Sequence, residues 1–142
     1  MTIIVVRDGV MAADRGMTKG EVVYGYRDKI IRLVDGSLYA GAGRNQDVLA
    51  VQAWLDGASE KPTQLDKSFR GIVLQADGAV YEIEAELVLE YYDQPYCYVG
   101  SEHAECFAHG ALAMGATAEQ AVRLTVDHCV YANGDVQVES IL

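Results

Sequence analysis

The sequence predicts an α+β fold in which mainly antiparallel sheets are covered by helices on both sides. Short β-rich runs separated by turn signals fill the first third and the middle of the chain, which is typical of hairpins. Apolar residues recur at helical spacing in three other stretches. The resulting order is strands, helix, strands, two helices and a strand, and sheets covered by helices bury such a chain well.

In the first half, the turn dipeptides Asp8-Gly9 and Asp35-Gly36 separate short β-rich runs. The expected strands are 2–7, 10–14, 29–33 and 38–40. Residues 45–56 place apolar side chains close to helical spacing, which predicts a helix. The polar stretch 57–67, which contains Pro62, is expected to be a surface connection rather than a domain linker.

In the second half, Asp77-Gly78 forms the turn of another predicted hairpin. The expected strands are 70–76, 79–83, 87–92, 96–99 and 136–142. A helix is predicted between Ser101 and Gly115 from apolar residues three and four apart. Thr117, followed three residues later by Gln120, has the form of a capping box that opens a further helix.

The 142 residues, of which 51% are hydrophobic and 23% charged, match one compact domain over 1–142. The formal net charge is −10, from 11 basic and 21 acidic residues, and no basic cluster offsets it. Such a charge repels phosphate backbones, so we expect no nucleic-acid partner.

The chain has no apolar run of the roughly 20 residues that span a bilayer, and its start lacks the pattern of a signal peptide. We therefore expect no membrane partner and a cytoplasmic location. Three cysteines, Cys97, Cys106 and Cys129, lie within apolar stretches. Their odd number and apolar surroundings predict buried, reduced thiols.

Thr2 is a candidate nucleophile because removal of Met1 would give it a free α-amine beside its hydroxyl. An α-amine titrates near pH 8, so the residue would carry its own general base. The alternative from this residue alone is an ordinary position in the first strand.

The run from Thr2 to Asp14 resembles the opening hairpin of the proteasome β-subunit and bacterial HslV peptidase family. Lys29 matches the catalytic lysine of that family, and residues 38–43 resemble its small-residue strand end. Residues 98–101 resemble its Gly-Ser helix start, and residues 118–133 are similar to the penultimate helix of the HslV branch.

The resemblance implies a four-layer αββα sandwich of the N-terminal-nucleophile hydrolase type. The chain is shortened between Asp56 and Arg70, where the family has a second long helix. It also lacks the late Asp-x-x-Ser-Gly motif of proteasome subunits, since the corresponding stretch is 129–134.

The implied activity is that of a threonine-type peptidase or amidase that needs no cofactor or metal. Thr2 would attack the carbonyl, and the Lys29 ammonium would stabilise the alkoxide. Asp14 would hold Lys29 charged and oriented. The Gly41 N–H would donate to the oxyanion, and Ser101 would position the amine or the attacking water.

Each of these residues also has a purely structural interpretation. Asp14 would cap a turn, and Lys29 would be a solvated strand charge. Gly41 and Gly43 would permit a tight passage from strand to helix. Ser101 would be a helix N-cap, a role that is compatible with the catalytic one.

A zinc site at His103, Cys106 and His109 is rejected because positions six apart on a helix differ in direction by about 240°, so the two histidines face apart.

The expected partners are a peptide or protein substrate, further copies of the chain in a homo-oligomeric ring, and an ATP-dependent unfoldase. The tyrosine-rich stretch 91–98 is expected to serve packing or subunit contacts. Two alternatives stay open: a catalytically inactive structural or assembly protein, and an amidase for a small molecule.

Overall fold

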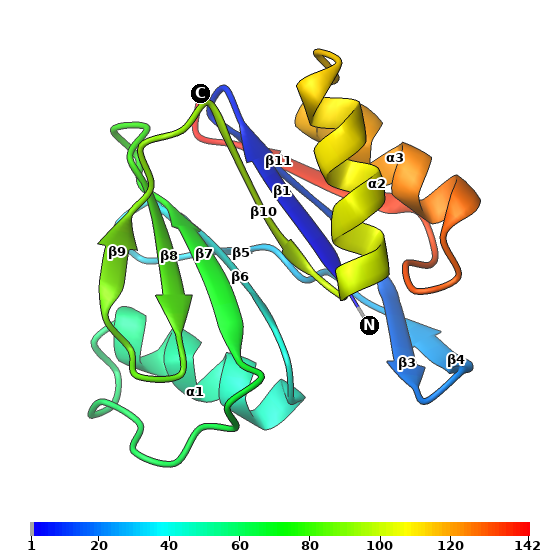
Figure 1. Cartoon of the computed structure of the whole chain (residues 1–142). Helices are drawn as coiled ribbons and strands as arrows, with labels where there is room; N and C mark the ends of the chain where they lie inside the picture. The colour runs from blue at the N-terminus through cyan, green and yellow to red at the C-terminus, as the bar shows by residue number, and fades with distance from the viewer. Residues whose placement is uncertain (1) are drawn as a thin grey trace.

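The computed structural model describes residues 2–142, and Met1 lies outside the described residues. Two sheets lie face to face, with helices α2 and α3 on the outer side of one and helix α1 on the outer side of the other (Figure 1). The predicted four-layer αββα sandwich is therefore confirmed.

The first sheet has the strand order β10-β1-β2-β11, and all three pairings are antiparallel. Its strands are β1 (Ile3–Arg7), β2 (Val10–Asp14), β10 (Tyr96–Gly100) and β11 (Val136–Ser140). Asp8 and Gly9 between β1 and β2 both have positive φ angles, 54° and 74°, as a tight hairpin turn requires. Strand β1 is buried on both faces, because Ile3 and Val5 face the helices while Ile4 and Val6 face the second sheet.

The second sheet is antiparallel and has the order β5-β6-β7-β8-β9. Its strands are β5 (Ile31–Arg32), β6 (Leu38–Ala42), β7 (Arg70–Leu74), β8 (Val80–Glu84) and β9 (Leu89–Tyr91). Helix α1 (Asn45–Leu55) packs Val48 and Val51 against Tyr39 and Phe69 on the outer face of this sheet. This apolar packing fixes the position of the end of β6, where Gly41 lies.

Helices α2 (Glu102–Ala113) and α3 (Ala118–His128) cover the first sheet. The predicted capping box is confirmed: Gln120 N donates to Thr117 Oγ1, and Thr117 N donates to Gln120 Oε1. Arg7 at the end of β1 donates to the carbonyls of Leu112 and Ala116, at 2.8 and 3.0 Å. These bonds tie the connection between the two helices to the sheet.

A hairpin of β3 (Gly16–Lys19) and β4 (Val22–Tyr26) was not predicted, and it extends beyond the two large sheets (Figure 1). It carries exposed Val22, Tyr24 and Tyr26 on alternate positions. The predicted strand at 29–33 was too long, since only Ile31 and Arg32 pair with β6.

The connection 57–67 contains no helix or strand, which agrees with the shortened middle. It is held to the start of α1 by Asp47, which is 4% exposed and accepts hydrogen bonds from Asp66 N and Arg44 Nε, both at 3.1 Å. Within 2–142, no helix is long and apolar enough to cross a membrane.

The prediction for the thiols holds for Cys97 and Cys129, which are buried and free, but it is wrong for Cys106, which is exposed. Apolar residues next to Cys106 in the sequence do not show which face of α2 it occupies, and the buried face carries Ala104, Ala108 and Leu112 instead. Burial raises the pKa of the Cys97 thiol, with the nearby Glu82 carboxylate acting in the same direction, so this thiol stays protonated.

Candidate active site

The hydroxyl of Thr2 lies beside the side chain of Lys29. Thr2 immediately precedes β1 and is half-buried, and Lys29 Nζ donates a hydrogen bond to its Oγ1. Lys29 is only 8% exposed and belongs to neither a helix nor a strand. It is therefore no solvated strand charge.

Asp14, the last residue of β2, is completely buried and joins three distant segments. Its Oδ1 accepts from Lys29 Nζ at 3.1 Å and from Ile3 N at 2.9 Å, while its Oδ2 accepts from Asn133 N at 3.0 Å. The turn-cap interpretation is wrong because the carboxylate points into the interior. One carboxylate thus fixes both the Lys29 ammonium and the chain at the start of β1.

The pKa of Lys29 lies below its ordinary value. Burial is the main cause, because it disfavours the charged ammonium, and the charge of Arg27 acts in the same direction. The Asp14 carboxylate opposes both effects through its charge and its hydrogen bond. The buried Asp14 carboxylate is therefore a counter-ion that favours the charged form of Lys29.

Ser101 occupies the N-cap position of α2, as the structural interpretation predicted, yet its side chain makes no cap hydrogen bond. Among the described residues, its buried Oγ has no hydrogen-bond partner. Buried hydroxyls are rarely left unsatisfied, so the Ser101 hydroxyl is available to bind a water molecule or a ligand. Capping alone does not account for a serine here.

Gly100 brings Ser101 close to Thr2, because Ser101 N donates to the Thr2 carbonyl at 3.2 Å. A Cβ atom on Gly100 would lie 2.4 Å from that carbonyl oxygen and 3.0 Å from Ile3 Cδ1. The contact between β1 and β10 at this point requires glycine. The Gly100 N–H donates to Glu105 Oε1 at 3.1 Å, which fixes the strand end to α2.

A pocket of about 580 Å³ opens beside these residues. Its lining includes four of the five predicted site residues, namely Thr2, Lys29, Gly41 and Ser101. Asp14 does not line it and lies behind the Lys29 ammonium. The fold therefore brings all five predicted residues to one place.

Gly41 lies near the end of β6, opposite Gly71. A Cβ on Gly41 would come within 2.8 Å of the Tyr39 hydroxyl, which is buried and donates to the Val48 carbonyl at 3.0 Å. Gly43 has a φ of +123°, which fits the predicted tight passage into α1.

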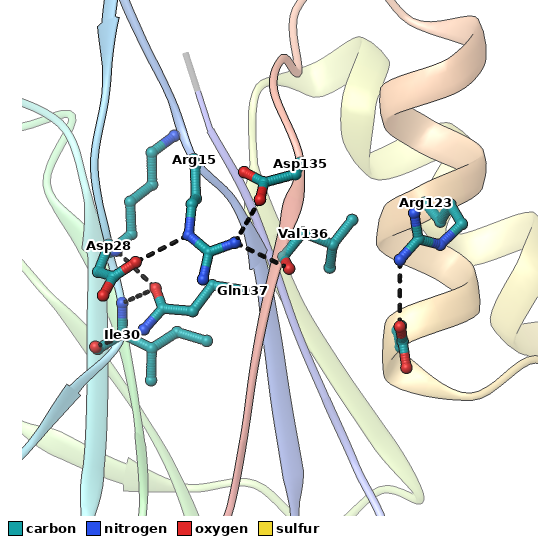
Figure 2. Close-up of polar contacts among 9 residues, drawn as sticks. Arg15, Asp28, Ile30, Arg123, Asp135, Val136 and Gln137 are labelled. Carbon is teal, nitrogen blue, oxygen red and sulfur yellow. Dashed lines mark hydrogen bonds and ion pairs between the residues drawn. The ribbon is translucent and has the colours of Figure 1, made fainter.

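Gln137 and Arg15, which the sequence analysis did not single out, hold the segment that carries Lys29. The Gln137 amide bonds to the backbone of Lys29 and Ile30, and Arg15 pairs with Asp28 (Figure 2). The one available signal was an uncharged polar residue between Val136 and Val138 in an apolar strand.

The histidines of the rejected zinc pattern have separate aromatic partners. The His103 ring lies 5.1 Å from the Tyr131 ring, whereas His109 Nδ1 lies 2.9 Å from the Tyr98 hydroxyl. Within 2–142, no group of three His, Cys, Asp or Glu residues is placed to hold a metal ion.

No protein-family model matches the chain, and no curated protein matches it. Solved structures, in contrast, match the chain. Eukaryotic HslV from Trypanosoma brucei superposes with a TM-score of 0.70 at 22% identity, covering 98% of each chain. The chain has an HslV-like fold.

Two structures of BPH from Thiobacillus denitrificans, one of them in complex with epoxomicin, superpose on the HslV-like fold with a TM-score of 0.65. Each is 18% identical and covers 99% of this chain and 98% of its own. Identities this low establish the fold, and the chemistry has to be argued from the site.

Proposed function

We propose that this chain is a threonine-type peptidase or amidase whose nucleophile is Thr2, exposed by removal of Met1. One observation carries the proposal: Lys29 Nζ donates to Thr2 Oγ1 and lies 3.1 Å from the buried Asp14 carboxylate. A buried ammonium beside a hydroxyl lowers the free energy of the alkoxide that attacks a carbonyl. Packing alone gives no reason to bury this charge.

In the proposed reaction, the α-amine of Thr2 takes the hydroxyl proton while Oγ1 bonds to the substrate carbonyl carbon. The Gly41 N–H donates to the oxyanion, a contribution whose loss typically costs about 10²–10³ in rate. The C–N bond then breaks, and the leaving amine receives the proton. Water, activated by the same α-amine, hydrolyses the resulting ester and restores Thr2.

Ser101 supports the proposal through its buried hydroxyl, which is without a partner among the described residues. The main chains of Ser101 and Thr2 are joined by a hydrogen bond, so an amine on Thr2 would form within reach of this side chain. We assign Ser101 to orient that amine or the attacking water.

The proposed substrate is a peptide or a protein. Two observations support it: a structural neighbour, BPH, forms a complex with epoxomicin, and Thr2 of this chain lines an open pocket. We further propose that residues 1–142 act as one domain within a homo-oligomeric ring in the cytoplasm, served by an ATP-dependent unfoldase.

A catalytically inactive assembly protein is the competing candidate. The absence of any helix between 57 and 67 favours it, because the corresponding family helix contributes to subunit contacts.

Intact mass spectrometry combined with epoxomicin labelling separates the two candidates. The hydrolase proposal predicts loss of one methionine, cleavage of fluorogenic peptides, and an epoxomicin adduct that is absent in folded Thr2→Ala. If assembled protein with a verified free Thr2 neither cleaves nor labels, the catalytic proposal fails and the structural candidate replaces it.

A further inference from the structure

The segment that carries Lys29 lies outside the strands and is fixed mainly by side chains, apart from the hydrogen bond that Arg27 N donates to the Arg15 carbonyl at 2.9 Å. Residues 27–30 belong to no helix or strand, and β5 begins only at Ile31. An extended segment without ladder hydrogen bonds needs other partners for its buried N–H and C=O groups. Lys29 and Ile30 are both buried, so their backbone partners decide where the ammonium lies.

Gln137 in β11 supplies these partners. Its side chain is 3% exposed, and its Oε1 accepts from Lys29 N at 2.7 Å and from Ile30 N at 2.9 Å. Its Nε2 donates to the Ile30 carbonyl at 2.9 Å (Figure 2). One amide thus satisfies three backbone groups of a segment 107 and 108 residues away.

The strand ladder links Gln137 to Asp14. In the pairing of β11 with β2, Gln137 lies opposite Ala13 and Val136 lies opposite Asp14. The amide that holds the Lys29 backbone and the carboxylate that holds its ammonium therefore belong to adjacent residue pairs of the β2–β11 pairing. The backbone and the side-chain end of Lys29 are both bound to the same sheet.

Arg15 provides a weaker support on the solvent side. Its Nε lies 2.8 Å from Asp28 Oδ1, and its Nη1 lies 2.8 Å from Asp135 Oδ2 and 3.2 Å from the Val136 carbonyl (Figure 2). Both carboxylates are largely exposed. Exposed ion pairs contribute little, so the buried amide is the main restraint.

We propose that Gln137 is a positioning residue that sets the place of the Lys29 ammonium relative to Thr2 and Asp14. This inference rests on the proposed function for its catalytic consequence, whereas its structural consequence for Lys29 stands independently. Loss of the amide removes the acceptor that the buried N–H groups of Lys29 and Ile30 share, and the segment moves toward water. A displacement of about 1 Å at a catalytic group costs about 10²-fold in rate.

The main test variant is Gln137→Met, which keeps the length of the side chain and loses all three hydrogen bonds. The second variant is Gln137→Asn, which keeps the amide but withdraws it by one methylene. Glu139→Gln is the matched control, because it lies in the same strand and loses only a 3.8 Å ion pair with Arg32.

Peptide cleavage should show a loss of kcat of about tenfold or more in Gln137→Met, with KM within about twofold of wild type. Gln137→Asn should lose less, and Glu139→Gln should match wild type. Unchanged kcat in a folded Gln137→Met protein would overturn the proposal. Should Gln137→Met not fold, the same criterion applies to Gln137→Asn.

A second readout does not depend on activity. The chain has four lysines, so ¹³C-labelled lysine Cε signals can be titrated by NMR, with Lys29 assigned from its missing signal in Lys29→Met. In both Gln137 variants the pKa of Lys29 should rise toward its ordinary value, because the released ammonium becomes hydrated. A Lys29 titration identical to wild type would overturn the proposal even if wild type proves to be inactive.

Discussion

Asp14 and Lys29 form a buried ion pair in which the carboxylate Oδ1 and the ammonium Nζ lie 3.1 Å apart. The same Oδ1 also accepts the N–H of Ile3, the residue after Thr2. One carboxylate oxygen therefore contacts both the Lys29 ammonium and the backbone beside Thr2, the proposed nucleophile.

Asp14→Asn should reduce the free energy of unfolding by about 3 kcal/mol, since removing one partner of a buried pair leaves an uncompensated charge. Chemical denaturation measures the loss. The matched control is Glu119→Gln, which breaks the Glu119–Arg123 pair of the same 3.1 Å length, whose side chains are both about half exposed on α3. This control should change stability by less than about 1 kcal/mol. Similar losses in both variants would show that burial of the Asp14 pair is unimportant.

The pH dependence of stability should report Lys29. Its pKa is lowered in the folded chain, so between that value and about 10.5 the unfolded chain binds a proton that the folded chain has released. Stability relative to Lys29→Met should therefore rise with pH across this window. Urea unfolding of both proteins at pH 8 to 10.5 tests the sign, and a difference that falls with pH contradicts it.

Activity should respond to the same group in the opposite direction. The ammonium is needed beside the alkoxide, so kcat/KM should fall on the alkaline side below pH 10.5, the ordinary value for lysine. Pre-incubation at each pH followed by assay at pH 8 separates this titration from irreversible loss of the fold.

Thr2→Ala should abolish peptide cleavage, and Lys29→Ala should nearly do so. Both residues act on the same step, so the double variant should be no slower than Thr2→Ala alone. Thr2→Ser should keep measurable activity because a hydroxyl and an α-amine both survive. Activity of folded, processed Thr2→Ala at wild-type level would exclude Thr2 as the nucleophile.

Gly100→Ala should lower both stability and activity. Its Cβ would lie 2.4 Å from the Thr2 carbonyl oxygen, so β1 and β10 must separate beside Thr2. Overpacking of this kind costs about 1–3 kcal/mol. Gly110→Ala in α2 is the control, because among the described residues nothing beyond its chain neighbours and the backbone of its own helix lies within 4 Å of the added Cβ. It should instead stabilise the helix by about 0.5–1 kcal/mol, as measured by thermal unfolding.

The proposed ring predicts a mass that is a multiple of 15.4 kDa. Light scattering at micromolar concentrations measures it. The exposed Tyr24 and Tyr26 of the β3–β4 hairpin offer apolar contact area that a lone chain leaves in water. A monomeric mass at every concentration would exclude the ring.

Local sequence signals predicted the β1–β2 hairpin, α1 and the Thr117 capping box, because turn residues and apolar spacing determine such elements directly. They did not predict β3 and β4, where Gly16, Gly20 and Gly25 interrupt the strand pattern. The candidate site residues were found through resemblance, since Asp14 and Lys29 taken separately have ordinary surface explanations. Gln137 was missed because its partners lie more than 100 residues away, and spacing along the chain carries no such information.

The contacts around Lys29 also constrain when the site can form during synthesis. Asp14 needs the N–H of Asn133, and the Lys29 backbone needs the amide of Gln137, so a nascent chain that has not yet emerged as far as Asn133 lacks both. Thr2 is translated first, and the segment that carries Lys29 is fixed last. The site proposed here as proteolytic would therefore assemble only after almost the whole chain has left the ribosome.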